Sequence, residues 1–176
     1  MGHADLRLEG HCQDMDAYQA IVGKRDRREY TNQPIPDQVR HRILQAGRMA
    51  GSSSNNQLGR LIVLNDRGAL AALAPAGRGT APMLKAPLSV AIVTQGASGF
   101  DIGRIAQNMM VAAWADGVAS CPQGVQDQEM ARKALGLPEG YTVGMCLAFG
   151  YPDESAPKRE SRPRLPLDEV VHWGRW

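Results

Sequence analysis

The sequence predicts one folded domain of a mixed class, either α/β or α+β, and three observations support this. The 176 residues suffice for one domain with a buried core. Apolar residues make up 43% of the chain and charged residues 22%, as in ordinary globular proteins. Short apolar runs typical of buried strands alternate with segments whose apolar residues recur every three or four positions, as in helices. Strands separated by helices give one of these two classes.

Two helices are expected before the first strand. The first covers residues 16–25, where Ala20 and Ile21 lie on one face. The second follows Pro34–Asp37, because a proline and an acidic residue favour the first helical turn. It ends at Gly51, where a polar stretch begins.

Two buried strands are expected next, at residues 60–65 and 88–94, where the sequence is almost continuously apolar. The alanine-rich segment 66–74 between them is predicted to be helical. Residues 75–82 are rich in glycine and proline and are predicted to form a loop.

The longest helix is predicted at residues 101–116. Its apolar stripe at helical spacing consists of Ile102, Ile105, Met109 and Ala113. The other faces also carry small or apolar side chains, so we expect a central helix with little exposure to water.

A capped helix at 127–135 and a third strand at 142–149 complete the predicted elements. The tail that follows Tyr151 is rich in prolines and charges, yet it ends with Trp173 and Trp176. Such large aromatic side chains are expected to be buried, either on their own domain or on a partner subunit.

The charge distribution is uneven and allows two interpretations. The net charge is only +2, which does not suggest a nucleic-acid-binding protein. Basic residues nevertheless gather in two clusters near opposite ends of the chain, at Lys24–Arg28 and Lys158–Arg164. The two clusters could form one compact anion site or two solvated surface patches.

Several classes of protein are excluded by the sequence. No apolar run approaches the roughly 20 residues that span a membrane, and the first residues lack the apolar centre of a secretory signal. Cys12, Cys121 and Cys146 have no disulfide spacing, which favours a reducing compartment, and we expect a cytoplasmic protein. No metal-ligand spacing, dinucleotide or phosphate loop, or nucleophile elbow is present. We therefore expect no metal and no catalytic side chain, with the chemistry carried by a cofactor.

Four segments, taken in order, carry the most specific pattern in the chain. They are Lys24–Tyr30 with Pro34–Pro36, Ala50–Gln57, Asp101–Met110, and Leu135–Gly140 leading to Phe149–Pro152. Together they resemble the nitroreductase-like family of FMN-dependent oxidoreductases. The resemblance implies an α+β fold, with a central and mostly antiparallel sheet flanked by helices, in an intertwined homodimer.

The same resemblance implies a division of the chain. Residues 1–15 would be a flexible leader, residues 16–152 the FMN-binding domain, and residues 153–176 a C-terminal arm that packs on the partner subunit. The implied cofactor-binding residues are Lys24, Arg25, Asp26, Arg28, Ser52, Ser53, Ser54, Asn55, Gln57, Pro122, Gln123, Gly124, Arg162 and Arg164.

The residue types suit this ligand. Lys24, Arg25 and Asp26 would lie at the phosphate and ribityl end, because the doubly charged phosphate needs several cations. Arg28 would lie near the pyrimidine edge, where a positive charge favours the reduced flavin. By resemblance, the segment 52–57 reaches the flavin from the other subunit, and the segment 122–124 presents a backbone N–H to flavin N5.

Three departures from the family pattern stand out. Asp26 replaces a serine, Gly51 replaces a proline, and Leu58-Gly59 replaces a proline-tryptophan pair. Residues 79–82 show no clear match to the polar residues that some members place near the pyrimidine ring.

The resemblance implies that NAD(P)H reduces the bound FMN, which then reduces a small-molecule acceptor such as a nitroaromatic or a quinone by a ping-pong mechanism. Two alternatives stay open. Asp26 is shared with the branch that includes dimethylbenzimidazole synthase, an oxygen-using enzyme that cleaves its flavin. The altered Leu58-Gly59 pair would suit a non-catalytic flavin-binding protein.

Overall fold

The computed structural model describes residues 15–157 and 162–176, so most of the predicted leader lies outside the described residues. The elements, in chain order, are α1 Ala17–Gly23, α2 Asp37–Arg48, η1 Ser53–Asn55, β1 Gly59–Val63, α3 Arg67–Leu73, η2 Ala74–Ala76, α4 Ala81–Lys85, β2 Leu88–Thr94, α5 Gly99–Ala115, β3 Ala119–Gln123, α6 Gln128–Leu135, β4 Thr142–Gly150 and α7 Leu167–Val170. The helices and strands expected from the sequence are all present, with their ends shifted by a few residues.

The centre of the fold is a four-stranded sheet in the order β1-β2-β4-β3. All three pairings are antiparallel, which confirms the α+β class with an antiparallel sheet. The two inner strands, β2 and β4, come from distant parts of the sequence. Every residue of β2 is buried, because helices cover both faces of the sheet at this strand.

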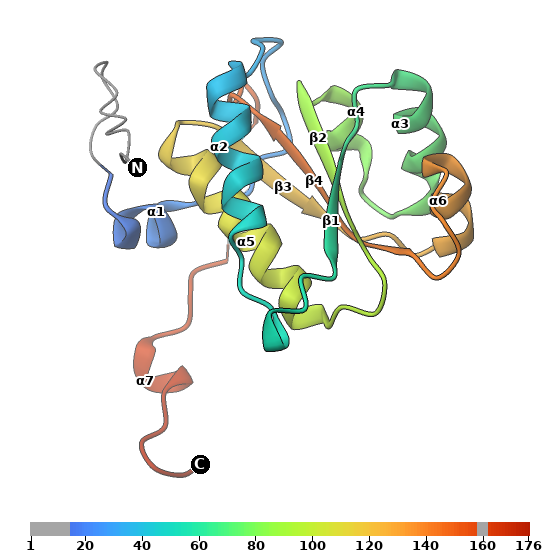
Figure 1. The fold of residues 1–176 in the computed structure, drawn as a ribbon. Helices are drawn as coiled ribbons and strands as arrows, with labels where there is room; N and C mark the ends of the chain where they lie inside the picture. Colours follow the sequence, from blue (N-terminus) through green and yellow to red (C-terminus); the bar gives the residue numbers. More distant parts are fainter. Residues whose placement is uncertain (1–14, 158–161) are drawn as a thin grey trace, which may run out of the picture.

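Helices form a layer on each face of the sheet (Figure 1). On one face α2 and α5 pack together, and Ile43 and Met109 meet Val90 and Ile92 of β2 in one apolar cluster. On the other face α3, α4 and α6 form a second cluster around the remaining β2 side chains. Because side chains alternate between the two faces of a strand, β2 contributes residues to both clusters.

The helix ends follow the capping residues of the sequence. The Asp16 side chain accepts a hydrogen bond from the backbone N–H of Gln19 at the start of α1, in a reciprocal capping box. Asp127 caps α6 by accepting from Met130 N at 2.8 Å. That helix ends at Gly136, whose φ of 59° lies in the left-handed region that favours glycine.

Two elements differ from the sequence prediction. The predicted loop at 75–82 is wrong in part, since it includes η2 and the start of α4, where Pro82 lies in the first turn. The strand β3 was not predicted, because Ser120 and Pro122 interrupt its apolar pattern. Proline lacks a backbone N–H and is tolerated here because β3 lies at the edge of the sheet.

The described part of the C-terminal arm extends away from the domain (Figure 1). Trp173 is 91% exposed and Trp176 is 99% exposed, so neither tryptophan is buried on its own domain. Packing of this arm on a partner subunit stays a prediction. Among the helices of the described residues, none has the length and apolar character needed to cross a membrane.

We expect the Asp127→Ala variant to lower the free energy of unfolding by about 1 kcal/mol, because α6 loses its N-terminal cap. The matched control is Glu129→Gln, which removes only the exposed ion pair to Lys133 on the same helix and should change stability little. Urea unfolding at one fixed protein concentration measures both. Equal effects of the two changes would contradict the capping role.

Candidate functional site

The basic segment near the N-terminus lies against the free edge of β3. The backbone N–H of Arg27 donates to the Ser120 carbonyl at 3.0 Å, and Asp26 forms an isolated bridge with Ser120. Further along, Thr31 N donates to the Tyr151 carbonyl at 2.9 Å. These backbone contacts bring the first basic cluster next to the segment 121–124.

Tyr30 anchors this segment to the end of β4. Its hydroxyl donates to the Arg27 carbonyl at 2.7 Å, and its ring is buried. A Cβ atom on Gly150 would lie 2.7 Å from the Tyr30 ring, so only glycine allows this close approach. Burial, with Cys121 and Asp26 nearby, raises the pKa of the Tyr30 phenol far above its usual range, so it remains a donor.

A cavity of about 420 Å³ opens beside this edge. The basic segment contributes Arg28 and Glu29, and β3 with the residue after it contributes the segment 121–124. The η2–α4 region contributes Arg78, Gly79, Ala81, Pro82 and Lys85. Four residues predicted from the sequence as cofactor ligands therefore line one cavity: Arg28, Pro122, Gln123 and Gly124.

The wall of this cavity contains buried polar atoms without partners. Gln123 is 3% exposed, and both of its side-chain amide atoms lack a hydrogen-bond partner among the described residues. The amide lies close enough to Cys121 to lower the pKa of that thiol, but it makes no well-aligned hydrogen bond. Because buried polar groups in native proteins are nearly always paired, the Gln123 amide points to a ligand or a partner chain.

Cys121 is buried and free, as is Cys146. Burial raises the pKa of the Cys121 thiol, an effect that nearby Arg28 partly offsets. Burial also raises the pKa of Cys146 to about 12. Both thiols are therefore protonated at neutral pH and are poor nucleophiles.

Two further cations of the basic segment, Lys24 and Arg25, are engaged within the chain, whereas the buried Nε of Arg27 has no hydrogen-bond partner among the described residues. Lys24 pairs with Asp26, and its ammonium also lies 3.4 Å from the Met110 sulfur. The Arg25 guanidinium donates to the Val22 carbonyl at 2.7 Å and to the Lys24 carbonyl at 2.9 Å. The unusual Asp26 thus neutralises a neighbouring lysine.

The predicted segment 52–57 lies at the other edge of the sheet, before β1. Ser52 Oγ accepts from Gln57 N at 2.9 Å, and Ser53 N donates to Asp101 at 3.5 Å. Ser54, Asn55 and Gln57 have φ values of 48°, 54° and 50°, so the loop is tightly turned and its side chains from 53 to 57 are exposed. Within one chain, the described structure does not bring this segment to the cavity.

The Arg104 side chain lies over the glycine that precedes this loop. A Cβ atom on Gly51 would lie 2.3 Å from a guanidinium nitrogen of Arg104, the flexible end of an exposed side chain that would have to move to admit a larger residue. The same guanidinium lies 5.5 Å from the centre of the Phe100 ring.

The described arginines of the second basic cluster stand apart from the cavity. Arg162 and Arg164 are exposed on the arm before α7, and neither lines the cavity. Lys158 and Arg159 lie outside the described residues. Conversely, sequence analysis missed Arg78 and Lys85, which do line the cavity. No periodic or motif signal marked either residue.

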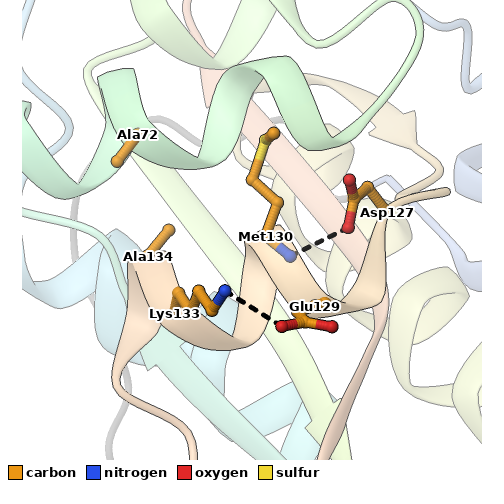
Figure 2. A pocket seen from close by; sticks show the side chains of 6 residues that line it. All are labelled: Ala72, Asp127, Glu129, Met130, Lys133 and Ala134. Carbon is orange, nitrogen blue, oxygen red and sulfur yellow. Dashed lines mark hydrogen bonds and ion pairs between the residues drawn. The ribbon is translucent and has the colours of Figure 1, made fainter.

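A second hollow, of about 600 Å³, lies between α3 and α6 (Figure 2). Its charged side chains are already paired: Lys133 with Glu129 at 2.9 Å, while Asp127 caps the helix. It therefore offers less to a ligand than the cavity at β3. Across residues 15–157 and 162–176, no cluster of three metal-ligating side chains occurs.

Comparison with known proteins identifies the family of this fold. The model of the nitroreductase family matches residues 21–100 and 97–151. The NADPH-flavin oxidoreductase of Vibrio harveyi is 32% identical over 88% of this chain and 72% of its own length. The NADH dehydrogenase of Thermus thermophilus is 28% identical over 94% of this chain and 100% of its own length.

A solved structure agrees with these matches. The NADPH:FMN oxidoreductase from Vibrio harveyi, in complex with NAD⁺, superposes with a TM-score of 0.81 at 27% identity, covering 91% of this chain and 77% of that chain. The family resemblance predicted from the four sequence segments is thereby confirmed, and the chain belongs to the nitroreductase family of oxidoreductases.

Proposed function

We propose that the protein is an FMN-dependent oxidoreductase that takes electrons from NAD(P)H and passes them to small-molecule acceptors, such as nitroaromatics or quinones. The single observation that carries the proposal is the buried, unpaired amide of Gln123 in a cavity that also holds the Arg28 guanidinium. A flavin offers the hydrogen-bonding ring edge and the negative charge that such groups bind. Relatives named as NADPH-flavin and NADPH:FMN oxidoreductases support this choice of ligand.

When bound, FMN supplies the two-electron chemistry, so the protein needs no nucleophile of its own. The residues of this chain bind and orient. Arg28 favours the negative charge that accumulates at the pyrimidine edge on reduction. The segment that contains Gln123 supplies hydrogen bonds to the flavin ring. Lys24 lies at the phosphate end, where its ion pair with Asp26 offsets its positive charge. Donor and acceptor would use one cavity in turn, which gives ping-pong kinetics.

The complete site is proposed to need two chains. The segment 52–57 lies at the sheet edge opposite the cavity, its side chains from 53 to 57 are exposed, and its side-chain hydrogen bonds, from Gln57 N to Ser52 Oγ and from Gln57 Nε2 to the Asn55 carbonyl, stay within the loop. In a homodimer this segment would reach the partner's flavin, while the arm with Arg162 and Arg164 would close on the phosphate. The free thiols suit a reducing compartment such as the cytoplasm.

We expect the purified protein to carry about one FMN per chain and to be bleached by NADH or NADPH under anaerobic conditions, with colour restored by a quinone or nitroaromatic. Absorbance of the flavin measures both steps. Bound flavin that neither nucleotide bleaches would indicate a non-catalytic flavin-binding protein. Loss of the flavin with formation of a new aromatic product under oxygen would indicate the benzimidazole-forming reaction.

Arg28→Gln should weaken FMN binding by roughly ten- to hundredfold, because a charge-assisted contact is lost. It should also lower the midpoint potential of the bound flavin, since the cation no longer favours the charge gained on reduction. Fluorescence titration and spectroelectrochemistry measure the two quantities. Arg28→Lys, which keeps the charge, should retain most of the potential. Unchanged affinity and potential in Arg28→Gln would refute the role.

A complementation experiment tests the two-chain site. Asn55→Ala/Gln57→Ala and Gln123→Ala homodimers should each bind FMN weakly, because both sites of each dimer are damaged. Mixed, refolded dimers should recover about a quarter of the sites, because each heterodimer holds one intact site. FMN content after dialysis gives the readout. If mixing recovers nothing, the two segments do not meet across the dimer.

A further inference from the structure

The loop between η2 and α4 is locked to the end of β3. The carbonyl of Ala76 accepts hydrogen bonds from the backbone N–H groups of both Gln126 and Asp127 at 2.9 Å. In return, the Gln126 side chain accepts from the backbone N–H of Arg78 at 2.7 Å. Three hydrogen bonds thus fix the loop to the segment that follows Gly124.

Close packing removes the remaining freedom of this loop. A Cβ atom on Gly77 would lie 2.4 Å from the Gly124 carbonyl oxygen, a backbone atom that cannot swing aside. Thr80 is 5% exposed, and its hydroxyl donates to the Ala74 carbonyl at 2.6 Å. The backbone of Arg78 is therefore held at a set position beside the cavity.

Among the cations that line the cavity, Arg78 has neither an ion-pair partner among the described residues nor a role in the proposed flavin site. Lys85 pairs with Glu29 at 2.9 Å, and Arg28 is assigned to the flavin in the proposed function. The Arg78 guanidinium lines the same cavity and makes no hydrogen bond or ion pair with any side chain or carbonyl of the described residues. A guanidinium fork at a fixed backbone position is suited to binding a carboxylate or a phosphate.

We propose that Arg78 binds the anionic group of the molecule that exchanges electrons at this cavity, so that the enzyme selects charged over neutral reactants. The inference rests on the proposed function and adds a specificity-determining residue to it. If the electron acceptor carries the anionic group, that group is a carboxylate. If the nicotinamide donor carries it, the group is a phosphate. A guanidinium binds both groups in the same way, and the experiment distinguishes the two sources.

The experiment compares the FMN-loaded wild type with Arg78→Gln and with the control Lys133→Gln, which removes one positive charge from exposed α6. One arm measures kcat/KM for 4-nitrobenzoate against its neutral isostere 4-nitrobenzamide. A second arm compares NADPH with NADH in flavin bleaching. A third arm titrates benzoate and benzamide by calorimetry, which needs no turnover.

We expect Arg78→Gln to reduce the preference for the anionic reactant by roughly ten- to hundredfold, either for the acceptor pair or for NADPH over NADH. The pair in which the preference falls identifies the molecule whose anionic group Arg78 binds. Benzoate binding should weaken while benzamide binding stays the same, and the Lys133→Gln protein should match the wild type. Unchanged preferences in all three arms would overturn the inference. So would a loss of FMN affinity alone, which would make Arg78 a ligand of the cofactor.

Failure of the proposed function gives a different pattern. In that case the wild-type protein fails to be bleached by either nucleotide, while the calorimetric arm still measures the charge preference conferred by Arg78. A wild type that is bleached but shows no effect of Arg78→Gln rejects the inference alone.

Discussion

The pairing of the segment 26–30 with the edge of β3 is the contact on which the site depends. A short edge strand that contains a proline has few backbone donors, so it gains a neighbour only over one or two residues. Here the hydrogen bond from Arg27 to Ser120 and the buried Tyr30 fix the pairing. As a result, Arg28 projects into the cavity whose other wall is β3 itself. The edge is covered, and the same contact builds the candidate site.

Much of the fold followed from periodicity, because long regular elements carry strong signals. The strand β2 is an almost continuous apolar run, and the helix α5 carries an apolar stripe at helical spacing, patterns that few other structures would fit. In contrast, β3 is held by its partner β4 and by tertiary contacts, which leave no periodic trace in five residues that include Ser120 and Pro122. The same holds for α4. Its Pro82 favours a loop in the sequence, but the first turn of a helix tolerates proline, and Pro82 lies in that turn.

The site was only partly predictable for a related reason. Family motifs identified Arg28 and the segment 122–124, which the fold does bring together. They also identified the segment 52–57 and the arm arginines, which one chain leaves elsewhere. Arg78 carried no motif, since its place depends on hydrogen bonds accepted by the Ala76 carbonyl and by the Gln126 side chain rather than on spacing. The ion pairs of Lys24 and Lys85 likewise decide which cations remain unpaired, and these pairings are properties of the folded chain.

The strand order has a consequence for the protein during its synthesis. The last strand of the described sheet, β4, lies between β2 and β3 and pairs with both. Until residue 150 has left the ribosome, β3 has no sheet to join, and β2 has an open side toward the missing strand. At the roughly 5–20 residues per second of translation, this interval lasts a few seconds. During that time the unpaired side of the apolar strand β2 is exposed to pairing with wrong partners.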